Sequence, residues 1–176
     1  MTSNDFSENI RLARSGDTAA FARLYETIYK DMYKIAMYCL RNEHDACDAV
    51  SDAVLDAFCS IGKLKNEKAF RSWIMRILSA KIKRKQREYF TDALEYTESD
   101  EESAVSADIS FEGMELSVDL KDALERLDPQ SRLILSMSVI EGYKSEEISD
   151  ILSLKASTVR SRLFRIKQQL RTELTR

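Results

Sequence analysis

The residues best suited to chemistry with another molecule lie near the C-terminus. Residues 155–176 contain seven basic side chains and one acid, Glu173. Apolar residues at three-and-four spacing mark the buried face of one long helix: Val159, Leu163, Ile166, Leu170 and Leu174. The opposite face then carries mainly donors and one aromatic ring: Arg160, Ser161, Phe164 and Arg165.

This face has the chemistry that a helix needs in the major groove of DNA. Arginine and serine can donate to base edges and phosphates, and an aromatic ring can contact thymine methyl groups. Ser157 and Thr158 can offer hydroxyl and backbone donors to a phosphate at the start of the helix. A solvated basic helix is the alternative, but the outward Phe164 argues against it. We therefore predict that this helix reads duplex DNA.

A second basic segment covers residues 71–87 and contains no acid. Its cations are Arg71, Arg76, Lys81, Lys83, Arg84, Lys85 and Arg87. This density attracts a phosphate backbone, so we expect nucleic-acid binding, with a solvated helix end as the alternative. Trp73 could stack on a base, but it lies on the apolar stripe of Phe70 and Ile77, which favours core packing.

An acidic row precedes this segment. Asp48, Asp52 and Asp56 recur every four residues, just after Asp45. Like charges at this spacing weaken an isolated helix by roughly a few tenths of a kcal/mol each. A basic partner would offset the repulsion, and a solubilising surface explains the row equally well.

The sequence shows no recognisable catalytic centre. His44 is the only histidine and falls in a polar turn. No nucleophile–histidine pair or glycine-rich phosphate loop can be assembled. Cys39, Cys47 and Cys59 lack the spacing of metal ligands, which favours reduced thiols in a cytoplasmic protein. We expect no enzyme activity, no metal or cofactor and no small-molecule substrate.

The elements that must position these residues are predicted to be helices. Four Gly and one Pro among 176 residues are too few for a β-sandwich or barrel, and no apolar run could span a membrane. After a break at Asp17, helices are expected over residues 18–41, 45–61 and 66–89, and a stripe follows over 116–127. Asp128 and Pro129 then open a helix closed by Gly142, and Ser145 caps a short one. This short helix, a turn and the long basic helix form a helix-turn-helix pattern.

Charge is segregated along the chain. The net charge is −3, yet residues 88–119 contain eleven acids and no Lys or Arg. Residues 91–115 are rich in Ser, Asp and Glu and lack a helical apolar stripe. We interpret them as a flexible acidic linker between two small basic helical domains.

Several segments resemble regions 2 and 4 of extracytoplasmic-function sigma factors, a group of the sigma-70 family. Residues 14–25 (RSGDTAAFARLY) resemble the start of region 2, residues 45–50 with Phe58 resemble its polymerase-binding helix, and residues 70–77 resemble the segment that opens the promoter −10 element. Residues 127–132 (LDPQSR), 146–148 and 158–163 resemble region 4. The order is that of the family, and the similarity covers about residues 9–88 and 116–174.

The resemblance implies a non-enzymatic bacterial cytoplasmic protein that binds core RNA polymerase and promoter DNA. Region 2 would cover residues 1–90, the linker 91–115 and region 4 residues 116–176. The clamp helices of the large polymerase subunit would contact Asp48, Ser51, Asp52 and Leu55. The −10 element would be held by Trp73, Arg76, Ala80, Lys81, Arg84, Lys85 and Arg87, and the −35 element by Ser157, Thr158, Arg160, Ser161, Phe164 and Arg165. Region 4 would also meet the polymerase flap, an anti-sigma factor is a further expected partner, and the free protein is expected to be a monomer.

Some positions depart from the usual family pattern. Ser51 stands where Gln is usual, which would tune the polymerase contact differently. Ala80 stands where Asn is common and Arg84 where Asp is frequent, which would favour backbone over base contacts at the −10 element. Ser153 replaces the usual Gly of the helix-turn-helix. Two other functions are compatible with the charge pattern: a free-standing helix-turn-helix regulator that dimerises on a palindrome, and a module whose basic helices bind an acidic protein.

Overall fold

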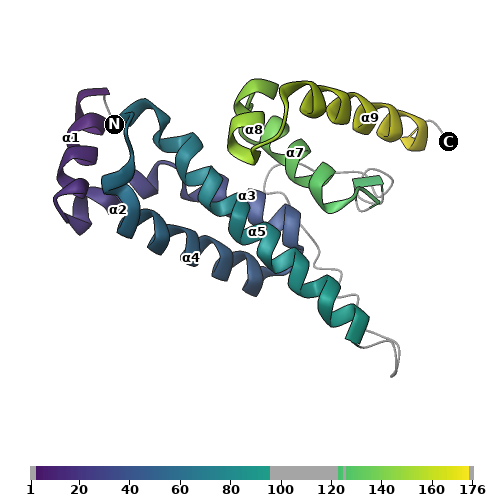
Figure 1. Ribbon diagram of the computed structural model, residues 1–176, viewed down its shortest axis with the longest axis horizontal. Coiled ribbons are helices and arrows are strands. Elements are labelled where there is room, and N and C mark those ends of the chain that lie inside the picture. The colour runs from purple at the N-terminus through teal and green to yellow at the C-terminus, as the bar shows by residue number, and fades with distance from the viewer. Residues whose placement is uncertain (1–2, 96–122, 125, 175–176) are drawn as a thin grey trace.

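The computed structural model describes residues 3–95, 123–124 and 126–174, and every regular element in these ranges is helical (Figure 1). Helices α1–α5 form an N-terminal group and helices α7–α9 form a C-terminal group. This arrangement confirms the expected all-α fold of two helical units. The greater part of the expected acidic linker lies outside the described residues.

The N-terminal group begins with α1 (Ser3–Arg14), which ends in a tight turn where Gly16 has a φ of +94°. The Asp17 carboxylate accepts a hydrogen bond from the Ala20 N–H and caps α2 (Thr18–Glu26), as its position predicted. Helices α3 (Tyr29–Leu40) and α4 (Glu43–Ser60) follow. Two short 3₁₀ turns, η1 (Ile61–Lys63) and η2 (Glu67–Ala69), then lead into the long α5 (Phe70–Glu95).

The expectation of one helix over residues 18–41 is wrong, because the chain breaks at Thr27 and Ile28. The Thr27 hydroxyl and N–H both donate to the Leu24 carbonyl, and the Ile28 N–H donates to the Tyr25 carbonyl. These short-range bonds tighten and end α2. The chain then turns so that Ile28, 1% exposed, enters the core. Since α2 and α3 both bury apolar residues at helical spacing, their stripes look continuous in the sequence.

Capping residues define where the helices of the C-terminal group begin and end. Asp128 accepts hydrogen bonds from the N–H groups of Gln130 and Ser131 and opens α7 (Pro129–Val139), as predicted. Gly142, with a φ of +68°, follows α7, and α8 (Ser145–Leu152) comes next. The expected cap at Ser145 is displaced by one residue: Lys144 is the N-cap, and its N–H donates to the Glu147 carboxylate at 2.8 Å.

The predicted helix-turn-helix is present in this group. A turn in which Ser153 adopts a left-handed φ of 55° joins α8 to α9 (Ala156–Leu174). Ser153 therefore occupies the conformation that glycine usually supplies at the end of a helix. Helix α8 packs against α9, and α7 packs against both.

One apolar core extends through both groups. In the N-terminal group, α5 contributes Phe70, Ile74, Met75, Leu78 and Ile82, all fully buried. Helix α7 packs on α3 and α8 packs on α5, so Leu133, Ile134, Met137 and Ile148 join the same core (Figure 1). Among the described helices, none has both the length and the apolar character needed to cross a lipid bilayer.

Candidate nucleic-acid interface

The face of α9 that was predicted to read DNA is open to solvent. Phe164 is 64% exposed. Ser157, Arg160, Ser161 and Arg165 are exposed as well, whereas Thr158 is half-buried. On the other face, Val159 packs in the main core and Ile166 packs in a smaller apolar cluster with Leu127 and Leu135. Helix α9 runs along the outer edge of the molecule (Figure 1). A duplex can therefore reach this face without any rearrangement of the C-terminal group.

The two helices of the helix-turn-helix are also joined by an ion pair. Arg160 Nη1 lies 2.7 Å from Glu146 Oε1 on α8, and both side chains are largely exposed. This pair orients the guanidinium at the outer surface. Because exposed ion pairs contribute little to stability, the guanidinium can exchange Glu146 for a phosphate or a base edge at low cost.

The predicted −10 residues of α5 divide between two sides of that helix. Lys81, Arg84 and Lys85 face α4, where each is ion-paired. Arg76 faces the C-terminal group, and its Nη2 donates to the Asp150 carbonyl of α8 at 2.7 Å. Ala80 and Arg87 line a groove of about 450 Å³ that is completed by Pro129, Gln130 and Leu133. The structure thus brings only part of the predicted set together on one surface.

Helices α4 and α5 are joined by a ladder of ion pairs that uses the whole acidic row. Its contacts are Lys81–Asp56 at 2.5 Å, Arg84–Asp52 at 3.1 Å, Lys85–Asp45 at 2.9 Å and Lys85–Asp48 at 3.7 Å. The Tyr89 hydroxyl also donates to Asp45. The basic segment of α5 is therefore a partner for the acidic row within the chain itself.

The Asp45–Lys85 pair of this ladder is stabilised in its charged form. Burial raises the pKa of Asp45, but hydrogen bonds from Tyr89 and Lys85 outweigh this effect and leave the pKa below its ordinary value. The hydrogen bond to Asp45 likewise raises the pKa of Lys85. Two residues before Lys85, burial alone lowers the pKa of Lys83.

The predicted polymerase-binding residues form an accessible strip on α4. Ser51 is exposed, and Leu55 exposes 63% of its surface. Asp48 and Asp52 contribute to the ladder, yet 47% and 43% of their side-chain surfaces remain exposed. An apolar residue beside two carboxylates suits a partner that presents basic side chains around an apolar contact.

Trp73 packs as the apolar stripe predicted. It is half-buried against the core, and its ring centroid lies 6.1 Å from that of Phe70. Part of the indole remains accessible, so core packing leaves some surface for a partner.

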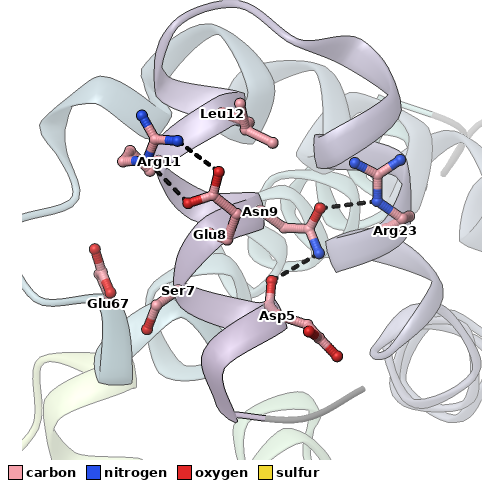
Figure 2. Close-up of a pocket in the computed structure, with 8 residues that line it drawn as sticks. All are labelled: Asp5, Ser7, Glu8, Asn9, Arg11, Leu12, Arg23 and Glu67. Atoms are coloured by element: carbon pink, nitrogen blue, oxygen red, sulfur yellow. Dashed lines mark hydrogen bonds and ion pairs between the residues drawn. The ribbon is translucent and has the colours of Figure 1, made fainter.

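An open pocket of about 790 Å³ lies beside α1 and α2 (Figure 2). Its polar groups bond to one another: Arg11 pairs with Glu8, and Arg23 Nε donates to Asn9 Oδ1 at 2.8 Å. None of the sequence-predicted site residues lines it. Within the described part of the chain, no cluster of three His, Cys, Asp or Glu side chains could hold a metal ion.

Sequence reasoning missed the contacts that join the two helix groups. Arg71 Nη2 lies 2.9 Å from both Asp31 Oδ2 on α3 and Glu141 Oε2 at the end of α7. The sequence marked Arg71 only as one cation of a basic segment. No local pattern could have identified Glu141 as its partner, because the pairing depends on how α7 docks on α3.

Comparisons with known proteins agree with the two-group arrangement. The profile of the family "Sigma-70 region 2" matches residues 24–89, and that of "Sigma-70, region 4" matches residues 117–170. The chain is 26% identical to the ECF RNA polymerase sigma factor SigW of Bacillus subtilis, over 95% of each protein. It is 25% identical to the ECF RNA polymerase sigma-E factor of Escherichia coli K12, over 92% of this chain and 90% of that protein.

Two solved structures share the fold. CnrH, in complex with the cytosolic domain of CnrY, matches with a TM-score of 0.72 and 23% identity over 97% of both chains. The sigma factor RpoE of Bartonella quintana, in complex with the anti-sigma factor NepR, matches with a TM-score of 0.73 and 19% identity. That match covers 88% of this chain and 96% of RpoE.

Proposed function

Because this chain belongs to the extracytoplasmic-function group of the sigma-70 family, we propose that it contacts core RNA polymerase through α4, the −10 element through α5 and the −35 element through α9. The chain is an RNA polymerase sigma factor, so its role is to direct the polymerase to promoters. Sigma factors are initiation factors, and the chemistry of RNA synthesis belongs to the polymerase. Helices α1–α5 correspond to region 2 and helices α7–α9 to region 4.

The exposed aromatic face of α9 carries the proposal. Phe164 stands on the second helix of a helix-turn-helix, with Arg160, Ser161 and Arg165 exposed around it. An apolar ring among donors suits a major-groove surface, where thymine methyl groups lie beside base acceptors and phosphates. We expect Ser157 and Thr158 to fix the helix on the phosphate backbone.

Region 2 would supply the other contacts. The strip of Ser51, Leu55 and the two exposed carboxylates on α4 would meet the clamp helices of the large polymerase subunit, and region 4 would meet the flap. On α5, the cations at positions 81, 84, 85 and 87 would hold the −10 phosphates. Each region alone should bind weakly, and tethering on the polymerase would raise the effective concentration of the second.

Further partners and the cellular location follow from the same role. CnrH was solved with part of CnrY and RpoE with the anti-sigma factor NepR. We propose that an anti-sigma factor also binds this chain. The free factor would be monomeric and would act in the bacterial cytoplasm, where the polymerase transcribes.

Promoter-directed transcription with Phe164→Ala tests this proposal. A matched control is Val139→Ala, because Val139 is 66% exposed and is the last residue of α7, not a residue of the reading helix α9. The factor, reconstituted with core polymerase, should transcribe a promoter selected by the parent protein. Loss of one buried apolar contact to a base should reduce promoter occupancy by Phe164→Ala roughly tenfold, as expected for about 1–3 kcal/mol per base contact.

Three outcomes decide the assignment. A decrease with Phe164→Ala but not with Val139→Ala supports −35 reading by α9. Equal transcription by both variants contradicts it. Tight sequence-specific binding of duplex DNA without polymerase, together with no stimulation of core polymerase, would instead identify a free-standing regulator.

A further inference from the structure

A groove of about 450 Å³ lies between α5 and the start of α7. The α5 residues that line it recur at three-and-four spacing, so they form one stripe of that helix. The α7 residues that line it belong to the first two turns of that helix. The described lining residues are Ala80, Lys83, Gln86 and Arg87 of α5 and Pro129, Gln130 and Leu133 of α7.

The lining of this α5–α7 groove is apolar and basic. Ala80, Pro129 and Leu133 supply apolar surface, and Leu133 is fully buried. Gln86 is 9% exposed, and its amide donates to the Cys39 carbonyl at 3.3 Å, which fixes that side chain. Among the described lining residues, none is acidic and none is aromatic. The groove therefore holds positive charge that its own walls do not neutralise.

Lys83 differs from its two neighbouring lysines on α5. Lys81 pairs with Asp56 and Lys85 pairs with Asp45, so both contribute to the ladder with α4. Lys83 is half-buried on the side that faces α7, and no acid in the described ranges forms an ion pair with it. Burial alone lowers its pKa. Because a cation withdrawn from water without a counter-charge costs free energy, an anion in the groove would be stabilised by Lys83.

The size and lining of the groove favour a small molecule. Sites for small ligands have volumes of about 300–1,000 Å³ and are mostly apolar, with a few polar groups that fix the orientation of the ligand. A nucleotide base needs an aromatic or guanidinium plane to stack on, and the described walls offer no aromatic ring. An apolar carbon body that carries one carboxylate matches the walls and the cation, and the half-buried Gln130 can donate from its amide.

We propose that the α5–α7 groove is a binding site for a small amphipathic carboxylate, whose apolar body lies against Ala80, Pro129 and Leu133 and whose charge pairs with Lys83. The site itself does not depend on the proposed function. Its consequence does, because Ala80 and Arg87 also belong to the proposed −10 surface. A bound carboxylate and a promoter strand would therefore compete for the same stripe of α5.

Calorimetric titration of the free protein tests the site. The ligands are naphthoate and octanoate, which have a ring body and a chain body, and the neutral amides naphthamide and octanamide. We expect saturable binding of at least one carboxylate to a single site, with an affinity at least about tenfold above that of its amide. This ratio is the one expected for a hydrogen bond to a charged group.

Two variants separate the charge from the space. Lys83→Met keeps the apolar stem and should remove the preference for the carboxylate over the amide. Ala80→Leu fills the groove from an exposed position of α5 and should weaken both ligands at least about tenfold. The matched controls are Lys63→Met on η1 and Ala22→Leu on α2, which change exposed residues outside the groove and should bind as the parent does.

The outcomes decide the proposal. Absence of saturable binding of both carboxylates to the folded parent at millimolar concentration would overturn the site, and so would equal affinity of the parent and Lys83→Met. Weaker promoter binding by Lys83→Met, together with no carboxylate binding by the parent, would instead assign Lys83 to a DNA phosphate.

Promoter-directed transcription tests the competition. The carboxylate that binds should lower transcription by the parent holoenzyme severalfold at saturation, and should leave the output of the Lys83→Met holoenzyme unchanged relative to that variant without ligand. Equal output of the parent with and without the carboxylate would contradict the competition. Inactivity of the parent without any ligand would reject the proposed function, whereas the titrations, which contain no polymerase, report on the site alone.

Discussion

Arg84 Nη2 on α5 lies 3.1 Å from Asp52 Oδ2 on α4, so a side chain assigned to −10 DNA and a side chain assigned to polymerase hold each other. The same ladder joins Lys85 to Asp45 and Asp48. A partner that binds the carboxylates of α4 frees the cations of α5 from their ion pairs. DNA that binds those cations likewise frees the carboxylates. The two proposed surfaces of region 2 are therefore electrostatically coupled.

Exchanging the charges of Asp52 and Arg84 separates the contribution of this pair to stability from its contribution to polymerase binding. Asp52→Lys should lower the free energy of unfolding by less than about 1 kcal/mol, because about half of each side chain in the pair is exposed to solvent. The double variant Asp52→Lys/Arg84→Glu should recover that stability by restoring an opposite-charge contact. Its affinity for core polymerase should remain reduced, because a cation still faces the clamp.

Chemical denaturation and a core-binding assay measure both quantities in one variant series. Glu26→Lys is the control, since it reverses an exposed charge on α2 outside the ladder. Recovery of polymerase binding in the exchanged pair would contradict a direct contact by Asp52 and would assign it a structural role only.

The ladder should make stability depend on pH in the acidic range. The pKa of Asp45 is lowered below 3.8 in the folded protein. A lowered carboxylate pKa stabilises the fold above the unfolded value, and this contribution disappears as the pH falls through the folded value. The thermal midpoint of the parent should therefore fall more steeply below about pH 4 than that of Asp45→Asn. Equal slopes in a pH series of thermal unfolding would contradict this account, and Glu26→Gln should follow the parent.

The cap of α7 should matter to the stability of region 4. Asp128→Ala removes the acceptor for the N–H groups of Gln130 and Ser131 and should cost about 1 kcal/mol, within the range of 0.5–2 known for such caps. Gln130→Ala, in the same turn, is the control, because it leaves the cap intact. Urea denaturation of both variants measures the difference, and similar losses would refute the capping role.

Salt dependence should distinguish a phosphate contact from a base contact on α9. Arg165→Gln should reduce the slope of log affinity against log salt concentration by about 0.9, because one phosphate fewer is neutralised. Phe164→Ala should weaken promoter binding while leaving that slope unchanged. Titration of the reconstituted holoenzyme on a promoter duplex over a range of KCl concentrations tests both variants. A lower slope with Phe164→Ala would contradict the assigned roles.

Local sequence chemistry predicted the features that depend on neighbouring residues. Asp17 and Asp128 cap the helices they precede, because an N-cap needs only a short acceptor before a helical stripe. Phe164 is exposed because the apolar stripe of α9 leaves it on the opposite face. The break at Thr27 was missed, since two consecutive amphipathic helices can share one apparent stripe.

Features that depend on long-range packing could not be predicted from local sequence patterns. The acidic row and the basic segment were both visible, but their pairing requires the crossing of α4 and α5, which no local spacing encodes. The docking of region 4 on region 2 was missed for the same reason. Arg71 and Glu141 are 70 positions apart, and only the packing of α7 on α3 brings them together.

The affinity of the labelled protein for purified bacterial core RNA polymerase tests the central claim most directly. It should be measured for the parent, for Asp48→Lys/Asp52→Lys and for Glu8→Lys/Glu26→Lys, which makes the same net charge change on exposed residues of α1 and α2. We predict tight binding by the parent and the control, and at least about tenfold weaker binding by the α4 variant. Absence of binding by the folded parent, or equal binding by all three proteins, would contradict the assignment of α4 as the polymerase-binding surface.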